Sequence, residues 1–329
     1  MIQTLKLWMS QQHLGVFLAC ITGFSAFGLQ AQTAWPQKTV RIMVGFPGGS
    51  TPDTAARILA DGLSKLWGQP VVVEAKVGAA GNLAADGVAK ANDDHTLGVV
   101  INGNLTSAKL LNPKLPYDPT KDLWPVSLLA TAPLLLVSPA DLPTGAAWVS
   151  AVRQANDKYS YGSVGIGSVG HLGMEVIKSA IGNFGAVHVP YSANPAIITA
   201  MLGGQVQMAL MPPALALAHV QAGKLRVVGV SADRRLPGVF ANVPTWKEQG
   251  VNLIYGGWRS IVGPKGLTAA QVAFWEGALR RASQSAEWKA ELERNYWTDD
   301  FVTSAQFRKD LDKDYADMKA VLVELGLAR

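Results

Sequence analysis

The stretch SVGIGSVGHLG, residues 163–173, decides how the rest of the chain is interpreted. It contains Gly165-x-Gly167-x-x-Gly170, the spacing of a dinucleotide-binding turn, between a strand-like segment and a helix predicted to begin near Ser168. A nucleotide-dependent enzyme is therefore one interpretation. That fingerprint also requires an acidic residue about 20 positions later, whereas the segment HVPYSANP (188–195) contains no Asp or Glu. The same turn also fits a cradle for another anion.

Other signs of catalysis are weak in this sequence. The serine elbow G-x-S-x-G of hydrolases fails at each candidate serine, namely Ser50, Ser163 and Ser168. The histidines, at positions 13, 95, 171, 188 and 219, show no metal-ligand spacing such as H-x-x-x-H. His171 fits a hydrogen-bonded residue at a helix start better than a catalytic base. We therefore expect a protein that is not an enzyme and that has no cofactor and no bound metal ion.

A second glycine turn lies in FPGGSTPD, residues 46–53, again between a predicted strand and a predicted helix. The glycine pair allows a sharp turn, and the hydroxyl of Ser50 or Thr51 suits a helix N-cap. A helix that begins there directs free N–H groups and the positive end of its dipole out of the turn. One such turn is commonly only structural. Two of them, in matching positions, predict a clamp for a small anion such as a carboxylate.

Apolar runs and helical patterns alternate along the chain, which predicts an α/β fold with parallel strands. One α/β unit covers residues 39–102, a second covers 133–231, and mainly helical sequence occupies 268–326. Each unit is too long to be one repeat of the other.

The apolar segments PLLLVSP (133–139) and SIVGP (260–264) are predicted to be two crossing hinge strands. Two lobes joined in this way close over a ligand held at the facing strand ends. The predicted limits are 35–134 plus 261–329 for lobe one and 135–260 for lobe two.

The N-terminal segment is predicted to be a signal peptide over residues 1–31, cleaved near 31–34. Leu14–Leu29 is uncharged and mostly apolar, and small residues follow it. A membrane anchor is the alternative, but the run is shorter than the roughly 20 residues of a spanning helix. A lipoprotein modified at Cys20 fits less well, because the apolar run continues past the cysteine. We therefore expect export to the periplasm.

Cleavage would remove Cys20, the one cysteine of the chain, and the one charged residue of the leader, Lys6. The mature chain would carry 28 Lys and Arg against 24 Asp and Glu, a net charge of +4. This mild positive charge suits an anionic ligand. The sequence contains no Lys/Arg run, so nucleic acid is not an expected partner. A monomer is expected.

Several motifs occur in a characteristic order between Trp35 and about Leu327. They are WPQKTVRIMVGFPGGSTPD (35–53), GQPVVVE (68–74), GAAGN (78–82), LNPKLPYDP (111–119), VSLLATAP (126–133), SVGIGSVGHL (163–172), HVPYSANPA (188–196), MLGGQVQMAL (201–210), AGKLRVVGVS (222–231) and VPTWKEQG (243–250). In these motifs the chain resembles the substrate-binding proteins of tripartite tricarboxylate transporters, the TctC or Bug family of extracytoplasmic solute receptors. The resemblance implies a type II periplasmic-binding-protein fold, no catalysis, and capture of a small carboxylate for membrane permease subunits.

The resemblance also implies which residues bind the ligand. The two glycine turns hold carboxylate groups in this family, partly through ordered water molecules. The corresponding residues of this chain are Phe46, Pro47, Gly48, Gly49, Ser50 and Asp53 from the first turn, and Ser163, Gly167, Ser168, Val169 and His171 from the second, with Tyr191 and Met211 nearby. For Asp53, a carboxylate in an anion site, the expected role is to cap the loop or to meet a donor on the ligand or a water.

Two departures from the family pattern bear on the ligand. Relatives often carry an acidic residue after the MLGGQV segment, but here Met208 to Met211 supply none, which argues against an amino acid. Arg259 precedes the second hinge strand, and we hypothesise that it pairs with a further carboxylate of a di- or tricarboxylate. A salt bridge in the hinge is the alternative role. A ligand sensor that reports to a membrane kinase is the alternative to a transport receptor.

Overall fold

The computed structural model describes residues 35–155, 158–182, 184–253, 255–324 and 326–328. Lys38–Arg329 form one compact unit, which is the subject of the following description. The predicted signal peptide and its cleavage region, residues 1–34, lie outside the described residues. No helix within the described ranges has the length and apolar character needed to cross a membrane.

The first sheet contains six strands in the described residues, in the order β11-β4-β10-β3-β1-β2. Strand β1 is parallel to β2 and β3, whereas β10 is antiparallel to both β3 and β4. The strands are β1 (Val40–Val44), β2 (Val71–Ala75), β3 (Thr96–Val100), β4 (Leu123–Pro133), β10 (Gly256–Pro264) and β11 (Thr298–Val302). The helices connected to this sheet are α2 (Thr51–Trp67), α3 (Asn82–Ala89), α4 (Asn102–Leu105), α5 (Ser107–Leu111), α10 (Ala269–Ala282), α11 (Ala286–Asn295) and α12 (Ser304–Glu324), with the 3₁₀ turn η1 (Ala79–Gly81) before α3.

The second sheet contains five strands in the described part of the chain, in the order β7-β6-β8-β5-β9. Strand β6 is parallel to β7 and β8, and β5 is antiparallel to β8 and β9. The strands are β5 (Leu135–Pro139), β6 (Tyr159–Ser163), β7 (Ala186–Pro190), β8 (Met208–Met211) and β9 (Leu225–Val230). The helices are α6 (Gly145–Ala155), α7 (Val169–Ala180), α8 (Asn194–Leu202) and α9 (Pro213–Gln221), and the 3₁₀ turn η3 (Gly238–Phe240) follows β9.

The predicted alternation of strands and helices is confirmed for most elements. The sequence pattern predicts a buried face of α2 made of Ala55, Leu59, Leu63 and Leu66; the first three are buried, whereas Leu66, in the last turn, is 42% exposed. The helix contacts all three parallel strands of its sheet. The sequence pattern predicts neither β4, apart from its last residue Pro133, nor β11. In β11, the segment TDDFV is polar and only partly buried, so its apolar pattern is too weak to indicate a strand.

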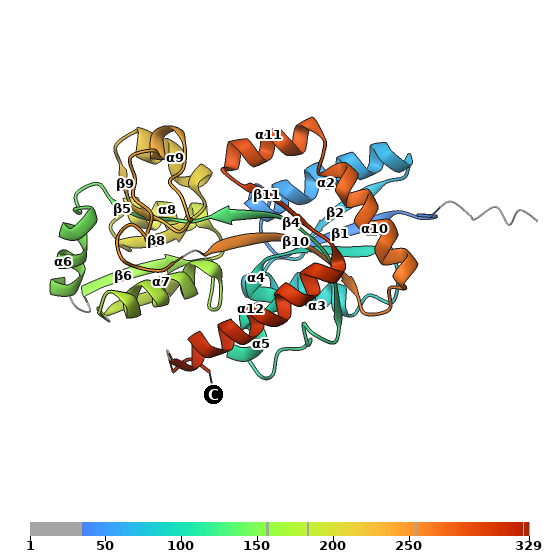
Figure 1. Cartoon of the computed structure of the whole chain (residues 1–329), viewed down its shortest axis with the longest axis horizontal. Helices are drawn as coiled ribbons and strands as arrows, with labels where there is room; N and C mark the ends of the chain where they lie inside the picture. Colours follow the sequence, from blue (N-terminus) through green and yellow to red (C-terminus); the bar gives the residue numbers. More distant parts are fainter. Residues whose placement is uncertain (1–34, 156–157, 183, 254, 325, 329) are drawn as a thin grey trace, which may run out of the picture. The chain divides into compact units, whose positions relative to one another are not determined.

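Two segments connect the sheets, and they lie side by side in the middle of Figure 1 as β4 and β10. The first crossing is at Leu134, between the end of β4 and the start of β5, within the predicted hinge segment. The chain returns to the first sheet at Gly256, earlier than the predicted strand 260–264. Gly256 and Gly257 weaken the strand pattern in the sequence, yet they pair with β4. The lobe limits themselves stay a prediction.

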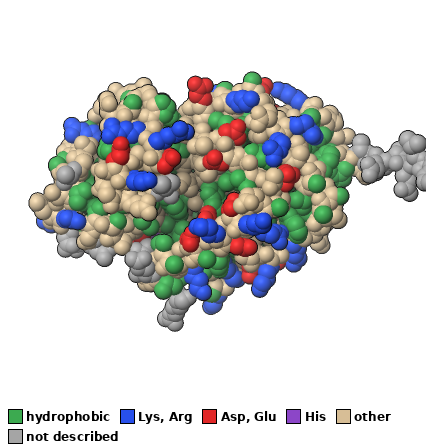
Figure 2. Space-filling view, viewed as in Figure 1, with side chains coloured by type: hydrophobic (Ala, Val, Ile, Leu, Met, Phe, Trp, Pro, Cys, Tyr) green, Lys and Arg blue, Asp and Glu red, His purple; other side chains and the backbone are tan. Residues whose placement is uncertain are grey.

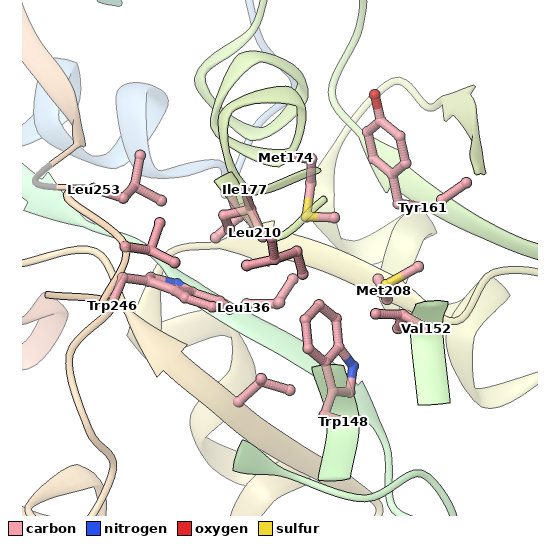
Figure 3. Packing of buried hydrophobic residues seen from close by; sticks show 14 of the residues in the cluster. Leu136, Trp148, Val152, Tyr161, Met174, Ile177, Met208, Leu210, Trp246 and Leu253 are labelled. Carbon is pink, nitrogen blue, oxygen red and sulfur yellow. The ribbon is translucent and has the colours of Figure 1, made fainter. Parts of the chain in front are cut away.

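The second sheet has an aromatic core on the side of helices α6 and α7. Trp148 and Trp246 are fully buried, with ring centroids 6.1 Å apart. Leu136, on the crossing strand β5, is also fully buried and lies among these rings (Figure 3). The segment that follows the first crossing is therefore fixed by packing on its helical side.

Leu136→Ala should destabilise the protein by about 2–5 kcal/mol, because it leaves a cavity in this core. The matched control is Leu202→Ala on α8, whose side chain is 44% exposed, and which should change the free energy of unfolding by at most about 0.5 kcal/mol. Urea denaturation followed by circular dichroism measures both. Equal effects of the two substitutions would show that the crossing strand is not held by this core.

Candidate functional site

A cavity of about 50 Å³ lies between residues of the two sheets. This volume is several times the roughly 10–15 Å³ that one water molecule requires. The lining comes largely from the carboxyl ends of parallel strands and the turns after them, which is where ligands bind in open α/β folds. The described lining residues are Phe46, Ser50, Thr51, Pro52, Ile101, Ala132, Leu134, Val164, Val169, Gly170, Ala193, Asn194, Leu210, Pro212, Gly257 and Arg259.

The N-termini of four helices meet at this cavity. Ser50 occupies the N-cap position of α2 without a side-chain capping bond, and Val169 begins α7. Asn194 begins α8, and Pro212 occupies the N-cap position of α9. The positive ends of several helix dipoles therefore converge on one small space, which favours an anion.

Arg259, on β10, supplies the cationic side chain of the lining. It is 4% exposed, and it makes no ion pair with a described residue. Its Nη2 donates to the Thr51 hydroxyl at 2.5 Å and its Nη1 to the Trp258 carbonyl at 2.9 Å, while its Nε has no partner among the described residues. Burial lowers the pKa of the guanidinium to about 9, so the group is cationic at neutral pH.

The guanidinium of Arg259 stacks over Trp297, with 4.7 Å between its Cζ and the ring centroid. Trp297 directly follows helix α11, where Tyr296 adopts the left-handed conformation and the Trp297 N–H donates to the Leu292 carbonyl. Trp297, Ile101 and Asn194 are site neighbours that the sequence pattern did not predict, and Thr51 was expected only as a possible N-cap. For Asn194 a signal existed, because Pro195 in the first helical turn after a strand marks a helix start; for Trp297 none did.

The first glycine turn contributes Phe46 and Ser50 to the lining, together with Thr51 and Pro52. The Ser50 hydroxyl is buried and has no hydrogen-bond partner among the described residues. Pro47, Gly48 and Gly49 lie outside the lining. Gly49 has a φ of 80°, and its N–H donates to the Asp53 carboxylate at 3.0 Å.

Asp53 supports this turn from behind and is absent from the described lining. Its carboxylate accepts from Gly49 N–H and pairs with Arg57 at 2.9 Å. Those contacts match the capping role expected for Asp53. None of the described lining residues is Asp or Glu.

The second glycine turn contributes Val169 to the lining, next to Gly170. The Ser168 hydroxyl accepts from the His171 N–H at 3.4 Å, and His171 Nδ1 accepts from the Gly167 N–H at 3.1 Å. These contacts fix the first turn of α7. Gly167 and Ser168 instead line a separate cavity of about 10 Å³, close to the size of one water molecule.

Ser163, Tyr191 and Met211 lie beside the cavity without lining it in the described structure. The Ser163 carbonyl accepts from the Tyr191 N–H at 2.8 Å, which holds the ends of β6 and β7 together. Met211 is fully buried in the core beside α8. Ligand contact by these three residues stays a prediction.

Two histidine rings lie in contact near the second turn, tilted by 32° relative to each other. The rings of His171 and His188 have centroids 4.2 Å apart, and Ser163 Oγ lies 2.7 Å from His188 Nε2. Burial lowers the pKa of both imidazoles, that of His188 to about 4, and for His188 the charge of His171 adds to the effect. Both rings are therefore neutral at pH 7, although Glu175 nearby acts in the opposite direction.

A larger groove, of about 1080 Å³, is lined by both crossing strands, the loop after β9 and the end of α11. We do not place the ligand there. Its charged residues Asp233, Arg234 and Arg235 are exposed, so an anion in the groove would remain hydrated. No three His, Cys, Asp or Glu side chains of the described residues are grouped closely enough to hold a metal ion.

On the face drawn in Figure 2, Lys and Arg side chains lie in small separate groups among Asp and Glu. Such a surface does not present the continuous basic stripe of a nucleic-acid-binding protein. Arg259, by contrast, is a positive charge buried in the interior.

The stability of the protein should fall between about pH 6.5 and pH 4 in a way that depends on His188. Because the native pKa lies below the roughly 6.5 of an unfolded histidine, the unfolded chain takes up the proton first as the pH falls. The stabilisation that neutral His188 provides is therefore fully present above pH 6.5 and is lost as the pH falls towards 4. His188→Gln should therefore lose less stability than the wild type between pH 7 and pH 4.5, measured by urea denaturation at each pH. If the difference in unfolding free energy between wild type and His188→Gln is the same at pH 7 and at pH 4.5, the prediction is wrong.

Comparison with known proteins gives the family. The model of the family described as "Tripartite tricarboxylate transporter family receptor" (TctC) matches residues 55–327. The chain is 33% identical to the "UPF0065 protein in gbd 5'region" of Cupriavidus necator over 313 residues, 93% of this chain and 94% of that protein.

Two solved structures are similar over most of their length. MatC from Rhodopseudomonas palustris, with bound malate, is 28% identical with a TM-score of 0.80, covering 88% of this chain and all of that one. The R. palustris protein Rpa4515, with adipate, is 27% identical with a TM-score of 0.83, covering 89% of this chain and 99% of that one.

The two sheets and their crossing strands are therefore those of the two-lobed periplasmic-binding-protein fold. The protein is a solute-binding receptor and not an enzyme. Gly165-x-Gly167-x-x-Gly170 accordingly is not a dinucleotide fingerprint here. The chain belongs to the TctC family of tripartite tricarboxylate transporter receptors.

Proposed function

We propose that this receptor captures a small organic carboxylate between its two lobes in the periplasm, after cleavage of its leader, and delivers it to the membrane permease of a tripartite tricarboxylate-type transporter. The family membership supports the transport role. The observation that carries the choice of ligand is the buried Arg259, which has no counter-charge among the described residues.

Burying an unpaired charge is costly, and the cost falls when an opposite charge and hydrogen bonds satisfy it. The helix N-termini around Arg259 add further positive potential. Because no described protein carboxylate neutralises Arg259, a bound ligand carboxylate would supply the missing negative charge. Within the described lining, the side-chain donors that lack a hydrogen-bond partner, and could donate to such a group, are Arg259 Nε and the Ser50 hydroxyl.

The favoured ligand in this proposal is a compact dicarboxylate. One carboxylate would lie at Arg259 and α2, and the other at the N-termini of α7 and α8 on the opposite wall. Two anion-binding walls, one with Arg259 and α2 and one with α7 and α8, match two carboxylates rather than three. The malate of MatC and the adipate of Rpa4515 are consistent with this class.

A compound with an α-amino group should bind poorly, because no acidic side chain is found in the described lining. We expect malate, succinate or adipate to raise the melting temperature in a thermal-shift screen, with citrate weaker. Aspartate, which differs from succinate by an amino group, should have little effect. Stabilisation by aspartate equal to that by succinate would refute the ligand class, and no response to any of these acids would refute the carboxylate proposal.

Arg259→Met should weaken binding of the best dicarboxylate by about 2–4 kcal/mol, which is about 30- to 1000-fold, through loss of a buried charge-assisted contact. The ligand-free variant should be as stable as the wild type or more so, because the unpaired buried charge is gone. Isothermal titration calorimetry measures the affinity. The matched control is Arg226→Met on β9, whose exposed side chain lies outside the lining. Unchanged affinity in Arg259→Met would exclude a direct role for Arg259.

A further inference from the structure

The turn at Gly165–Gly167 of the second sheet packs directly on the first. The Ser107 hydroxyl, at the start of α5, donates to the Gly167 carbonyl at 2.8 Å. The two residues are 60 positions apart in the chain, and both are buried. This contact joins the two halves of the molecule through protein atoms alone.

The turn 165–167 lies so close to the first half of the molecule that neither surface leaves room for a side chain at its glycines. A Cβ added at Gly103 would lie 2.7 Å from the Gly167 carbonyl oxygen, a backbone atom that cannot swing away. A Cβ added at Gly165 would lie 2.8 Å from that of Ala80, and one at Gly167 would lie 2.7 Å from Leu111 Cδ1. Glycine is therefore required by contact between the halves, in addition to the positive φ of Gly165 and Gly167.

The facing surface on the first half is held in an unusual conformation. Ala79 and Ala80 have φ values of 48° and 54°, in the left-handed region that alanine rarely adopts. Asn104 Nδ2 donates to the Ala80 carbonyl at 3.0 Å and to Asn82 Oδ1 at 2.8 Å. Such strain persists where the surroundings over-determine it, and it commonly marks functional positions.

We propose that Ala80, Gly103 and Ser107 form a seat for the turn 165–167, and that docking in this seat latches the lobes closed without help from the ligand. Gly167 immediately precedes Ser168, the N-cap of α7. Docking therefore also sets the position of the first turn of α7 at the cavity, which makes Ser107 and Gly103 positioning residues for the site. This inference rests on the proposed function for its purpose, but the latch itself is testable without any ligand.

Gly103→Ala is the decisive substitution. Gly103 lies in α4 at a negative φ, so alanine suits the backbone and should favour the helix by about 1 kcal/mol. Within the first half of the molecule the added Cβ would lie an ordinary 3.5 Å from the Ser107 hydroxyl. Its steric clash is with the Gly167 carbonyl oxygen of the second half. Gly62→Ala is the matched control, because Gly62 lies in helix α2 and an added Cβ would meet Ala282 at an ordinary 3.6 Å.

The experiment is hydrogen–deuterium exchange of the ligand-free mature protein, read in peptides covering residues 101–112 and 161–172, together with its radius of gyration from X-ray scattering. Gly103→Ala should exchange at least several-fold faster in both peptides and should have a larger radius of gyration. Ser107→Ala should show the same changes to a smaller extent, since it removes the hydrogen bond but keeps the fit. Gly62→Ala should match the wild type.

The proposal is overturned if Gly103→Ala matches the wild type, or if exchange rises in 101–112 alone, which would indicate a local distortion of α4. A melting temperature for Gly103→Ala close to that of the wild type shows that the variant has folded. Adding 10 mM malate or adipate to the wild type is a separate arm. Failure of both acids to protect the two peptides further would count against the proposed ligand class and leave the ligand-free result on the latch intact.

Discussion

A positive charge buried without a counter-charge among the described residues is the constraint around which this molecule is organised. Arg259 lies on β10, the strand by which the chain re-enters the first sheet, and its head group faces the N-termini of helices from both sheets. Each of these features makes the cavity more positive. An arrangement of this kind is unfavourable in isolation and becomes favourable with an anion in place, which is the property expected of a receptor.

The two glycine turns have similar sequences but place different physical demands on the residue. At Gly49 an added Cβ would meet nothing within 4 Å, so glycine there serves the positive φ and the N–H contact to Asp53. At Gly167 the added atom would collide with the first half of the molecule. The first turn therefore shapes one wall of the cavity. The second turn shapes the opposite wall, and its Gly167 also sets how closely the two halves of the molecule can approach each other.

The sequence pattern predicts the helices that carry these turns because N-cap hydroxyls, glycine and proline act locally. Ser50 and Ser168 both occupy N-cap positions, but only the Ser168 hydroxyl accepts a capping hydrogen bond, from the His171 N–H. The convergence of α8 and α9 on the same cavity, the stacking of Arg259 on Trp297, and the seat at Gly103 all join residues distant in the chain, and no local pattern encodes them. Several expected site residues lie outside the described cavity lining. Asp53, Ser163 and His171 carry polar groups typical of anion sites, but here these groups bond to backbone atoms of the two glycine turns.

The crossing strands separate the inner cavity from the outer groove by a single layer of residues. Ala132 on β4 borders both spaces, and on β10 the adjacent residues Trp258 and Arg259 border the groove and the cavity respectively, as the alternation of a strand requires. Trp297, against which the Arg259 head group rests, also borders the groove. A charge bound at Arg259 would therefore lie next to a buried indole that lines the outer groove, with a partition one strand thick between the two spaces.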